Sequence, residues 1–187
     1  INNENDKFSD ATILGTFMDN HDNARFLHDH DDLKNYQSAL VFQIFMQGIP
    51  IVYYGTEQAF NGGDDPANRA PLWTDMDPKS EMYNFISTVV KTRKEQQIWD
   101  YPHVERYVND NFYAFSRGDV LIATTNTHDE IDISITYLPD SYSEGTVVCN
   151  AFYPDQDCIS VKDGALQVTL LDGEPKIYVP QKTLVSE

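Results

Sequence analysis

The chain has 187 residues, of which 41% are hydrophobic, so it is long and apolar enough for one large domain or two small ones with real cores. Thirty acidic residues against thirteen basic ones give a formal net charge of −17 at pH 7, which repels nucleic-acid phosphates and anionic lipid surfaces. We therefore expect neither nucleic acid nor a membrane as a partner, and no apolar run reaches the roughly 18 residues that span a bilayer.

The N-terminal part of the chain predicts a strand, a helix and a second strand. Residues 12–18 are apolar or small, as in a buried strand, and residues 32–47 repeat apolar side chains at helical spacing. Gly48 supplies a helix stop, Pro50 prevents the helix from resuming, and residues 51–54 form a second short apolar strand. This order is typical of a parallel βαβ unit.

A polar segment without a periodic pattern follows over residues 56–80. Loops of this length inside compact domains are uncommon and are usually functional or disordered. The next predicted helix has Asp77 as its N-cap and Pro78 at its first position. Its apolar face consists of Met82, Phe85, Ile86, Val89 and Val90.

From about residue 98 the hydrophobic pattern changes to a period of two. The alternating runs are HVERYV, FYAFS, VLIATT, IDISITY, TVVCNAF, CISV, ALQVTLL and KIYV, with turn residues between them. This spacing predicts an antiparallel β-sandwich of about eight strands. We place the domain boundary so that residues 1–97 form the α/β part and residues 98–187 form the all-β part.

The two cysteines, Cys149 and Cys158, flank the segment NAFYPDQD, whose proline turn can bring its ends together. A disulfide that closes this short loop is predicted to stabilise the fold by roughly 2.5–3 kcal/mol in the chain-entropy model. A pair of cysteines is weak proof of a bridge, so two unpaired buried thiols remain the alternative.

Polar side chains gather where the two predicted parallel strands end. Asp19, Asn20, His21, Asp22 and Asn23 follow the first strand directly, in the stretch LGTFMDNHDNARF, and polar residues also follow the second strand. Ligands of parallel α/β folds meet the carboxyl ends of the strands, so these residues are a candidate site. The alternative is a polar strand cap that begins a turn.

Three motifs carry a resemblance to a known family. FMDNHDNARF, GIPIVYYGTEQ and GGDDPANRAPLW resemble the α-amylases of the α-glucan-active glycoside hydrolases, most closely the fungal-type enzymes. The resemblance spans the whole chain and implies the last two β/α units of a TIM (β/α)8 barrel, followed by a C-terminal antiparallel β-sandwich, the Greek-key domain C. It implies endo-hydrolysis of α-1,4-glucosidic bonds in starch or glycogen, with retention of configuration.

The same resemblance assigns roles to individual residues. It implies that Asp22 is the third catalytic carboxylate, a transition-state stabiliser that also contacts the substrate, and that His21 binds substrate hydroxyls. Negative charge near an oxocarbenium-like transition state is favourable, which makes the role physically sensible. Adjacent residues of a regular strand point to opposite faces, so the strand must have ended or bulged before His21. A hydrogen-bonded structural histidine is the alternative for His21.

Asp65 and Arg69 match the family's substrate contacts on the non-reducing side of the cleavage point. The alternative is a local Asp65–Arg69 ion pair that orders the loop, and both roles can coexist. The register of DPANR selects Asp65, although the adjacent Asp64 could also take part. We interpret Arg25 as a structural residue that ties the first loop by salt bridges.

The nucleophile and the general acid of a retaining glycosidase are implied to lie upstream of residue 1, on other barrel strands. The chain is thus expected to be the C-terminal portion of a longer enzyme, inactive alone, whose partners are an α-glucan and the missing N-terminal half of the barrel. Calcium is implied for the complete enzyme, and no metal ligand is identified in this chain. The INNENDKFSD start is too polar for a signal peptide, and secretion is expected from the resemblance alone.

Two other functions remain open at this point. An α-glucosidase or transglycosylase of the same clan would share the Asn-His-Asp motif. A noncatalytic carbohydrate-binding module would keep the sugar contacts without the chemistry.

Overall fold

A computed structural model describes residues 7–74 and 76–181 of the chain. The chain divides into two compact units, unit 1 over Ile1–Val90 and unit 2 over Lys91–Glu187. The division falls within helix α4 (Glu81–Glu95). The domain boundary that we place after residue 97 stays a prediction.

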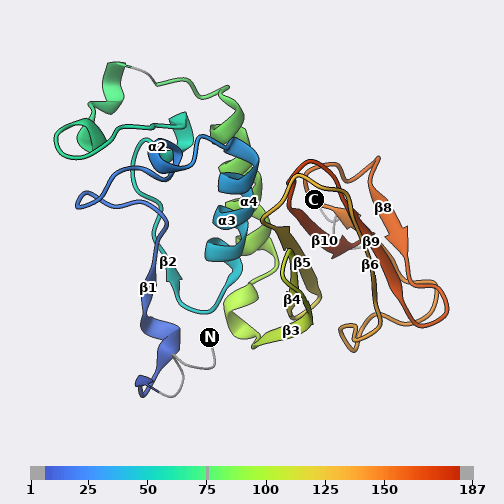
Figure 1. The fold of residues 1–187 in the computed structure, drawn as a ribbon. Helices are drawn as coiled ribbons and strands as arrows, with labels where there is room; N and C mark the ends of the chain where they lie inside the picture. The colour runs from blue at the N-terminus through green and yellow to red at the C-terminus, as the bar shows by residue number, and fades with distance from the viewer. Residues whose placement is uncertain (1–6, 75, 182–187) are drawn as a thin grey trace. The chain divides into compact units, whose positions relative to one another are not determined.

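Unit 1 contains the expected parallel βαβ arrangement (Figure 1). Strand β1 (Gly15–Thr16) pairs in parallel with β2 (Ile49–Pro50), and helix α3 (Leu33–Phe45) connects them. The backbone N–H of Ile49 donates to the Leu14 carbonyl, and that of Ile51 donates to the Thr16 carbonyl, each at 2.8 Å. The ladder is therefore only a few residues long.

Both strand predictions need correction. The strand expected over residues 12–18 is shortened at its start by the 3-10 helix η1 (Ala11–Ile13), which the Asp10 carboxylate caps through the Thr12 N–H. The second strand pairs at residues 49–50 and not at 51–54. An apolar run indicates which residues can be buried. Which of them form strand hydrogen bonds depends on the position of the neighbouring strand.

The two longer helices of unit 1, α3 and α4, begin at side-chain caps. In α3 the Asp32 carboxylate accepts the Asn35 N–H at 3.0 Å, and Gly48 follows the helix with a positive φ of 119°. Helix α4 begins at Glu81, later than predicted, because the Ser80 hydroxyl accepts the Tyr83 N–H at 3.1 Å. Among the described residues, no helix has the length and apolarity to cross a membrane.

Short helices occupy the remaining segments of unit 1. They are α2 (Phe26–Asp29), η2 (Thr56–Gln58), η3 (Ala67–Arg69) and η4 (Leu72–Thr74). A small core joins α2, α3 and α4 through Leu27, Tyr36, Leu40 and Met82. Apolar side chains along the two strands remain exposed, and Ile49 at 55% and Phe17 at 48% are examples. The sheet of unit 1 is thus barely covered.

Unit 2 starts with the end of α4 and η5 (Ile98–Asp100), and its described residues, up to 181, continue as eight antiparallel strands. These are β3 (His103–Val108), β4 (Phe112–Arg117), β5 (Val120–Thr125), β6 (Ile131–Ile135), β7 (Val147–Asn150), β8 (Cys158–Ser160), β9 (Leu166–Leu170) and β10 (Lys176–Pro180). Six of them form one sheet in the order β3-β4-β5-β10-β7-β8, and β6 pairs with β9. The antiparallel pattern predicted from the alternation is confirmed.

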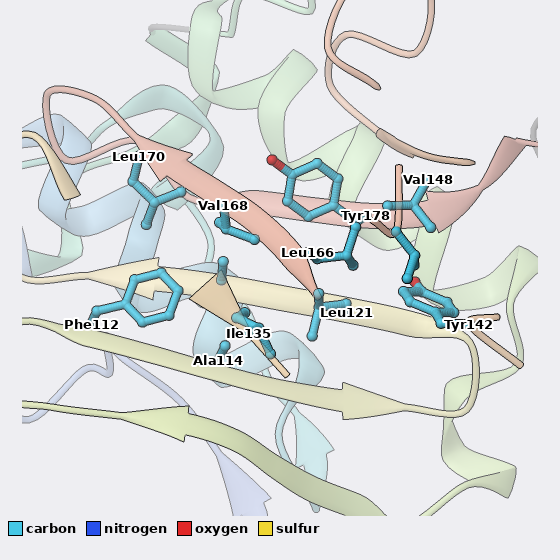
Figure 2. Packing of buried hydrophobic residues seen from close by; sticks show 12 residues of the cluster. Phe112, Ala114, Leu121, Ile135, Tyr142, Val148, Leu166, Val168, Leu170 and Tyr178 are labelled. Carbon is cyan, nitrogen blue, oxygen red and sulfur yellow. The ribbon is translucent and has the colours of Figure 1, made fainter. Parts of the chain in front are cut away.

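Both sheets of unit 2 contribute to one hydrophobic core (Figure 2). Leu121 and Tyr178 come from the larger sheet, and Ile135, Leu166 and Val168 come from the β6–β9 pair. All five residues are completely buried. Burial of inward-facing side chains from two sheets is the main source of stability of such an arrangement.

The predicted disulfide is present between Cys149 and Cys158. The two residues lie opposite each other on the antiparallel strands β7 and β8. The bridge therefore ties β8, which lies at the edge of the larger sheet, to its only neighbour in that sheet among the described residues.

Candidate functional site

A turn follows β1 and carries the candidate residues. The Asn20 side-chain oxygen accepts the backbone N–H groups of Asp22 and Asn23, each at 3.0 Å. Asparagine commonly organises turns in this way. His21 and Asp22 therefore lie on a turn beyond the strand, so the alternation of side chains along a strand does not separate them.

The side chains of His21 and Asp22 approach each other in solvent. His21 Nε2 lies 3.2 Å from Asp22 Oδ1, and 61% and 69% of the two side chains are exposed. A carboxylate and an imidazole in this position are both accessible to a ligand, and both can hydrogen-bond to hydroxyl groups.

Beneath the turn, Asp19 is a buried anchor. Its carboxylate accepts the Phe26 N–H at 2.8 Å and the Tyr36 hydroxyl at 2.7 Å. Burial, together with the charge of Asp19, raises the pKa of Tyr36 above its ordinary value, so the phenol stays protonated and donates. Asp19 thus fixes the exit of β1 to α2 and α3.

Arg25 joins three segments from a fully buried position. Its Nη2 donates to the Tyr54 carbonyl at 2.8 Å and its Nε to the Asn68 carbonyl at 3.0 Å, while Nη1 lies 3.6 Å from Asp19 Oδ2. The guanidinium also stacks over the Tyr53 ring, with Cζ 4.1 Å from the ring centroid. The structural role expected for Arg25 is confirmed, and carbonyl hydrogen bonds contribute to it beside the ion pair.

Asp65 and Arg69 lie on the loop after β2, and this loop contacts the turn after β1. Arg69 Nε donates to the His21 carbonyl at 3.1 Å and lies 3.3 Å from Asp65 Oδ1. Both side chains are largely exposed. The local ion pair is therefore present, and it leaves the carboxylate and the guanidinium within reach of a ligand. Asp64 is exposed as well, so its possible part stays open.

Asn68 is a central residue of the site that sequence reasoning missed. Its Nδ2 donates to the His21 carbonyl at 3.0 Å and to the Asn23 carbonyl at 2.9 Å. The residue is only 1% exposed. A polar residue inside a loop gives no signal of burial, and only its place beside Arg69 in DPANR could have drawn attention to it.

Glycines let the loop after β2 fold tightly. A Cβ atom at Gly62 would collide with the Ala67 carbonyl, and one at Gly63 would lie 2.9 Å from the His28 ring. The Gly62 carbonyl accepts the Arg25 N–H at 3.0 Å. The loop thus returns to the start of α2, and both segments lie at the same end of the β1–β2 pair (Figure 1).

The described residues do not offer a metal site. Within residues 7–74 and 76–181, no group of three or more His, Cys, Asp or Glu side chains is placed to hold a metal ion. Ca²⁺ prefers six to eight oxygen donors, and the described residues do not gather such a set of carboxylates, so we derive no step through this ion.

A family model and known proteins match the chain. Residues 1–88 match the model of the α-amylase catalytic domain. The chain is 33% identical over 183 residues to α-amylase 3 of Schizosaccharomyces pombe, covering 94% of this chain and 32% of that protein. It is 31% identical over 181 residues to the α-amylase of Saccharomycopsis fibuligera, covering 93% of this chain and 36% of that protein.

Solved structures extend the similarity to the fold of the whole chain. An α-amylase from Malbranchea cinnamomea matches with a TM-score of 0.91 and 30% identity, over 99% of this chain and 41% of that one. The α-amylase of Geobacillus thermoleovorans, solved in complex with acarbose, matches with a TM-score of 0.73 and 25% identity, over 89% of this chain and 38% of that one. The chain thus spans well under half of each of these proteins.

Proposed function

The chain belongs to the α-amylase family of glycoside hydrolases, and from this membership we propose that it is the C-terminal portion of a retaining, endo-acting α-amylase. The substrate class is α-1,4-linked glucan, as in starch, glycogen and maltooligosaccharides. The acarbose complex of the Geobacillus thermoleovorans enzyme supports an oligosaccharide as the ligand class.

In this proposal unit 1 supplies the end of a TIM barrel. Strands β1 and β2 correspond to its seventh and eighth strands, and unit 2 corresponds to a Greek-key domain C. The exposed apolar residues along the β1–β2 pair support the barrel, because neighbouring strands and helices of a complete barrel would cover them.

One observation carries the catalytic assignment. Asp22 presents an exposed carboxylate from a turn whose backbone is fixed by Asn20 and Asn68, beside the exposed Asp65–Arg69 pair. In a retaining mechanism, two further carboxylates act as nucleophile and general acid, and we expect them outside this chain. Asp22 would stabilise the oxocarbenium-like transition state by its charge, and it would hold substrate hydroxyls together with His21.

Asp65 and Arg69 would hold the sugar units on the non-reducing side of the cleavage point. The carboxylate can accept paired hydroxyl groups, and the terminal guanidinium nitrogens can donate in a fork. These contacts exist in the ground state as well as in the transition state, so they would act mainly on substrate affinity.

The charge of Asp22 is the feature to test. In the complete polypeptide, Asp22→Asn should keep the fold and lower kcat on maltooligosaccharides by ~10²–10³, the scale of losing one preorganised electrostatic contact. The matched control is Asp31→Asn, which neutralises another exposed aspartate of unit 1. Near-normal turnover of Asp22→Asn would return Asp22 to the role of a strand cap.

Product analysis separates the related activities. Early release of mixed maltooligosaccharides from starch is the result expected for an endo-acting hydrolase. Glucose as the first product would instead favour an α-glucosidase, and longer products would favour a transglycosylase.

Calcium and secretion are part of the same proposal. We expect calcium ligands of the complete enzyme to come from residues outside this chain. Secretion is supported by the Cys149–Cys158 disulfide, because such bonds persist mainly in oxidising compartments.

A further inference from the structure

We propose that Asn68 is a positioning residue, which holds the turn that carries Asp22 in the geometry needed for turnover. This inference rests on the proposed function, since it assigns a second residue to the same reaction. Asn68 itself is buried and does not contact the substrate in this proposal.

The first argument is the pattern of hydrogen bonds. Asn68 Nδ2 donates to the carbonyls of His21 and Asn23, the two residues that flank Asp22 in the chain. The His21 carbonyl is in the peptide group directly before Asp22, and the Asn23 carbonyl is in the second peptide group after it, so the two donations restrict backbone rotations along the turn on both sides of Asp22. The direction of the Asp22 side chain depends on these rotations, so the Asn68 amide controls where the carboxylate points.

The second argument concerns the orientation of the amide. Two carbonyl oxygens face the same end of the Asn68 side chain, and only the NH₂ group can donate to them. The Asn68 Oδ1 atom is buried and has no hydrogen-bond partner among the described residues. Among the described residues, the Asn68 side chain is therefore held by the hydrogen bonds of its NH₂ group alone, and both of these bonds go to the turn after β1.

The third argument is the way in which Asn68 is itself held. Its backbone carbonyl accepts Arg25 Nε at 3.0 Å, and it lies in η3 next to Arg69, whose Nε donates to the same His21 carbonyl. Two neighbouring side chains of η3, Asn68 and Arg69, thus hold the turn by hydrogen bonds to its backbone carbonyls. Movement of η3 would displace Asp22 and the proposed sugar ligand Arg69 together.

The test is a double-mutant cycle in the complete polypeptide. Asn68→Asp has nearly the same shape but replaces both donations with a carboxylate oxygen against two carbonyl oxygens. We expect kcat on maltooligosaccharides, per folded protein, to fall by about 10–100-fold, with KM changed less than kcat. In an Asp22→Asn background, the same substitution should change kcat by less than about threefold, since the charge to be positioned is gone.

Two controls make the outcome specific. Asn126→Asp also removes a side-chain donation to a carbonyl, that of Asp110, but in unit 2, and it should leave kcat unchanged. Asn68→Ala provides a second route to the same cycle if the aspartate variant does not fold. Folded protein is measured by thermal unfolding followed by circular dichroism.

The results separate this inference from the proposed function. If Asp22→Asn keeps normal turnover, the proposed function fails first. If Asp22→Asn is impaired but Asn68→Asp has no effect, or has the same effect in both backgrounds, only the role of Asn68 is overturned. Failure of both Asn68 variants to fold, with Asn126→Asp folded, would also overturn it and leave Asn68 a purely structural residue.

Discussion

In unit 2, side chains from two sheets pack into a common core. The part of unit 1 that the structure describes has two strands of two residues each, and apolar side chains beside them are exposed. Side-chain hydrogen bonds to backbone carbonyls replace packing at the end of β1, where Arg25 and Asn68 hold the turn. The candidate site thus lies in the unit with the smaller core. Sites on loops need such fixed support, because packing alone does not orient exposed side chains.

The largest expected effect concerns the core of unit 2. Leu121→Ala should lower the free energy of unfolding of unit 2 by about 3 kcal/mol, because it removes a fully buried side chain and leaves a cavity. Leu171→Ala is the matched control, since Leu171 is 55% exposed, and it should cost less than about 0.5 kcal/mol. Hydrogen exchange followed by mass spectrometry assigns the loss to peptides of unit 2.

The free energy of unfolding of a variant in β2 tests whether the strands of unit 1 remain exposed in the complete polypeptide. In the complete polypeptide, Ile49→Ala should cost about 2 kcal/mol if further chain covers β2, as the barrel proposal requires. A loss as small as that of Leu171→Ala would mean that β2 remains exposed and would count against the barrel.

An intermediate effect is expected at the edge of the larger sheet of unit 2. Replacing Cys149 and Cys158 together by Ala should destabilise unit 2 by about 2.7 kcal/mol in the chain-entropy model, given their sequence separation of 9. Peptides of β4 and β5, in the interior of the sheet, should lose hydrogen-exchange protection as well as those of β8, because the chain-entropy model places the effect in the unfolded state of the whole unit. Loss confined to β8 would show instead that the bridge only prevents local opening of the sheet edge.

A pH dependence of stability is also expected in unit 2, from its partly buried His103. Burial, with a further contribution from the charge of Arg117, lowers the pKa of His103 to about 4. The unfolded chain has a value near 6.5, so between these values the unfolded state binds more protons, and the free energy of unfolding must fall as the pH drops from about 6.5 to 4. Thermal unfolding of His103→Gln should show a weaker pH dependence across this window. Identical slopes for both proteins would contradict the low pKa.

The predictability of the fold differs between the units for a physical reason. The run HVERYV became β3 and the run VLIATT became β5 with the same bounds, because alternation and turn residues are local signals for antiparallel strands. In unit 1 the pairing at residues 49–50 depends on the position of β1, which lies more than thirty residues away in the chain. No local pattern contains that information.

The exposed residues of the candidate site were predictable from the sequence, as was the structural role of Arg25, but the other buried residues that hold the site were not. Asp22 and Arg69 stand in motifs that the resemblance identified, and the structure brings their segments together. Asp19 and Asn68 are buried and act through hydrogen bonds to distant residues, which depend on the three-dimensional fold. The late start of α4 had a local cause, because Ser80 competes with Asp77 as a cap.

The hydrogen bonds from η3 to the turn after β1 have a consequence for protein engineering. The carbonyl of His21 takes its hydrogen bonds from side chains of η3, far along the chain, so the two segments form one discontinuous module. Exchanging only the loop after β2 for one without counterparts of Asn68 and Arg69 would remove the donors to the His21 carbonyl. A productive graft would have to transfer residues 19–25 together with residues 59–70.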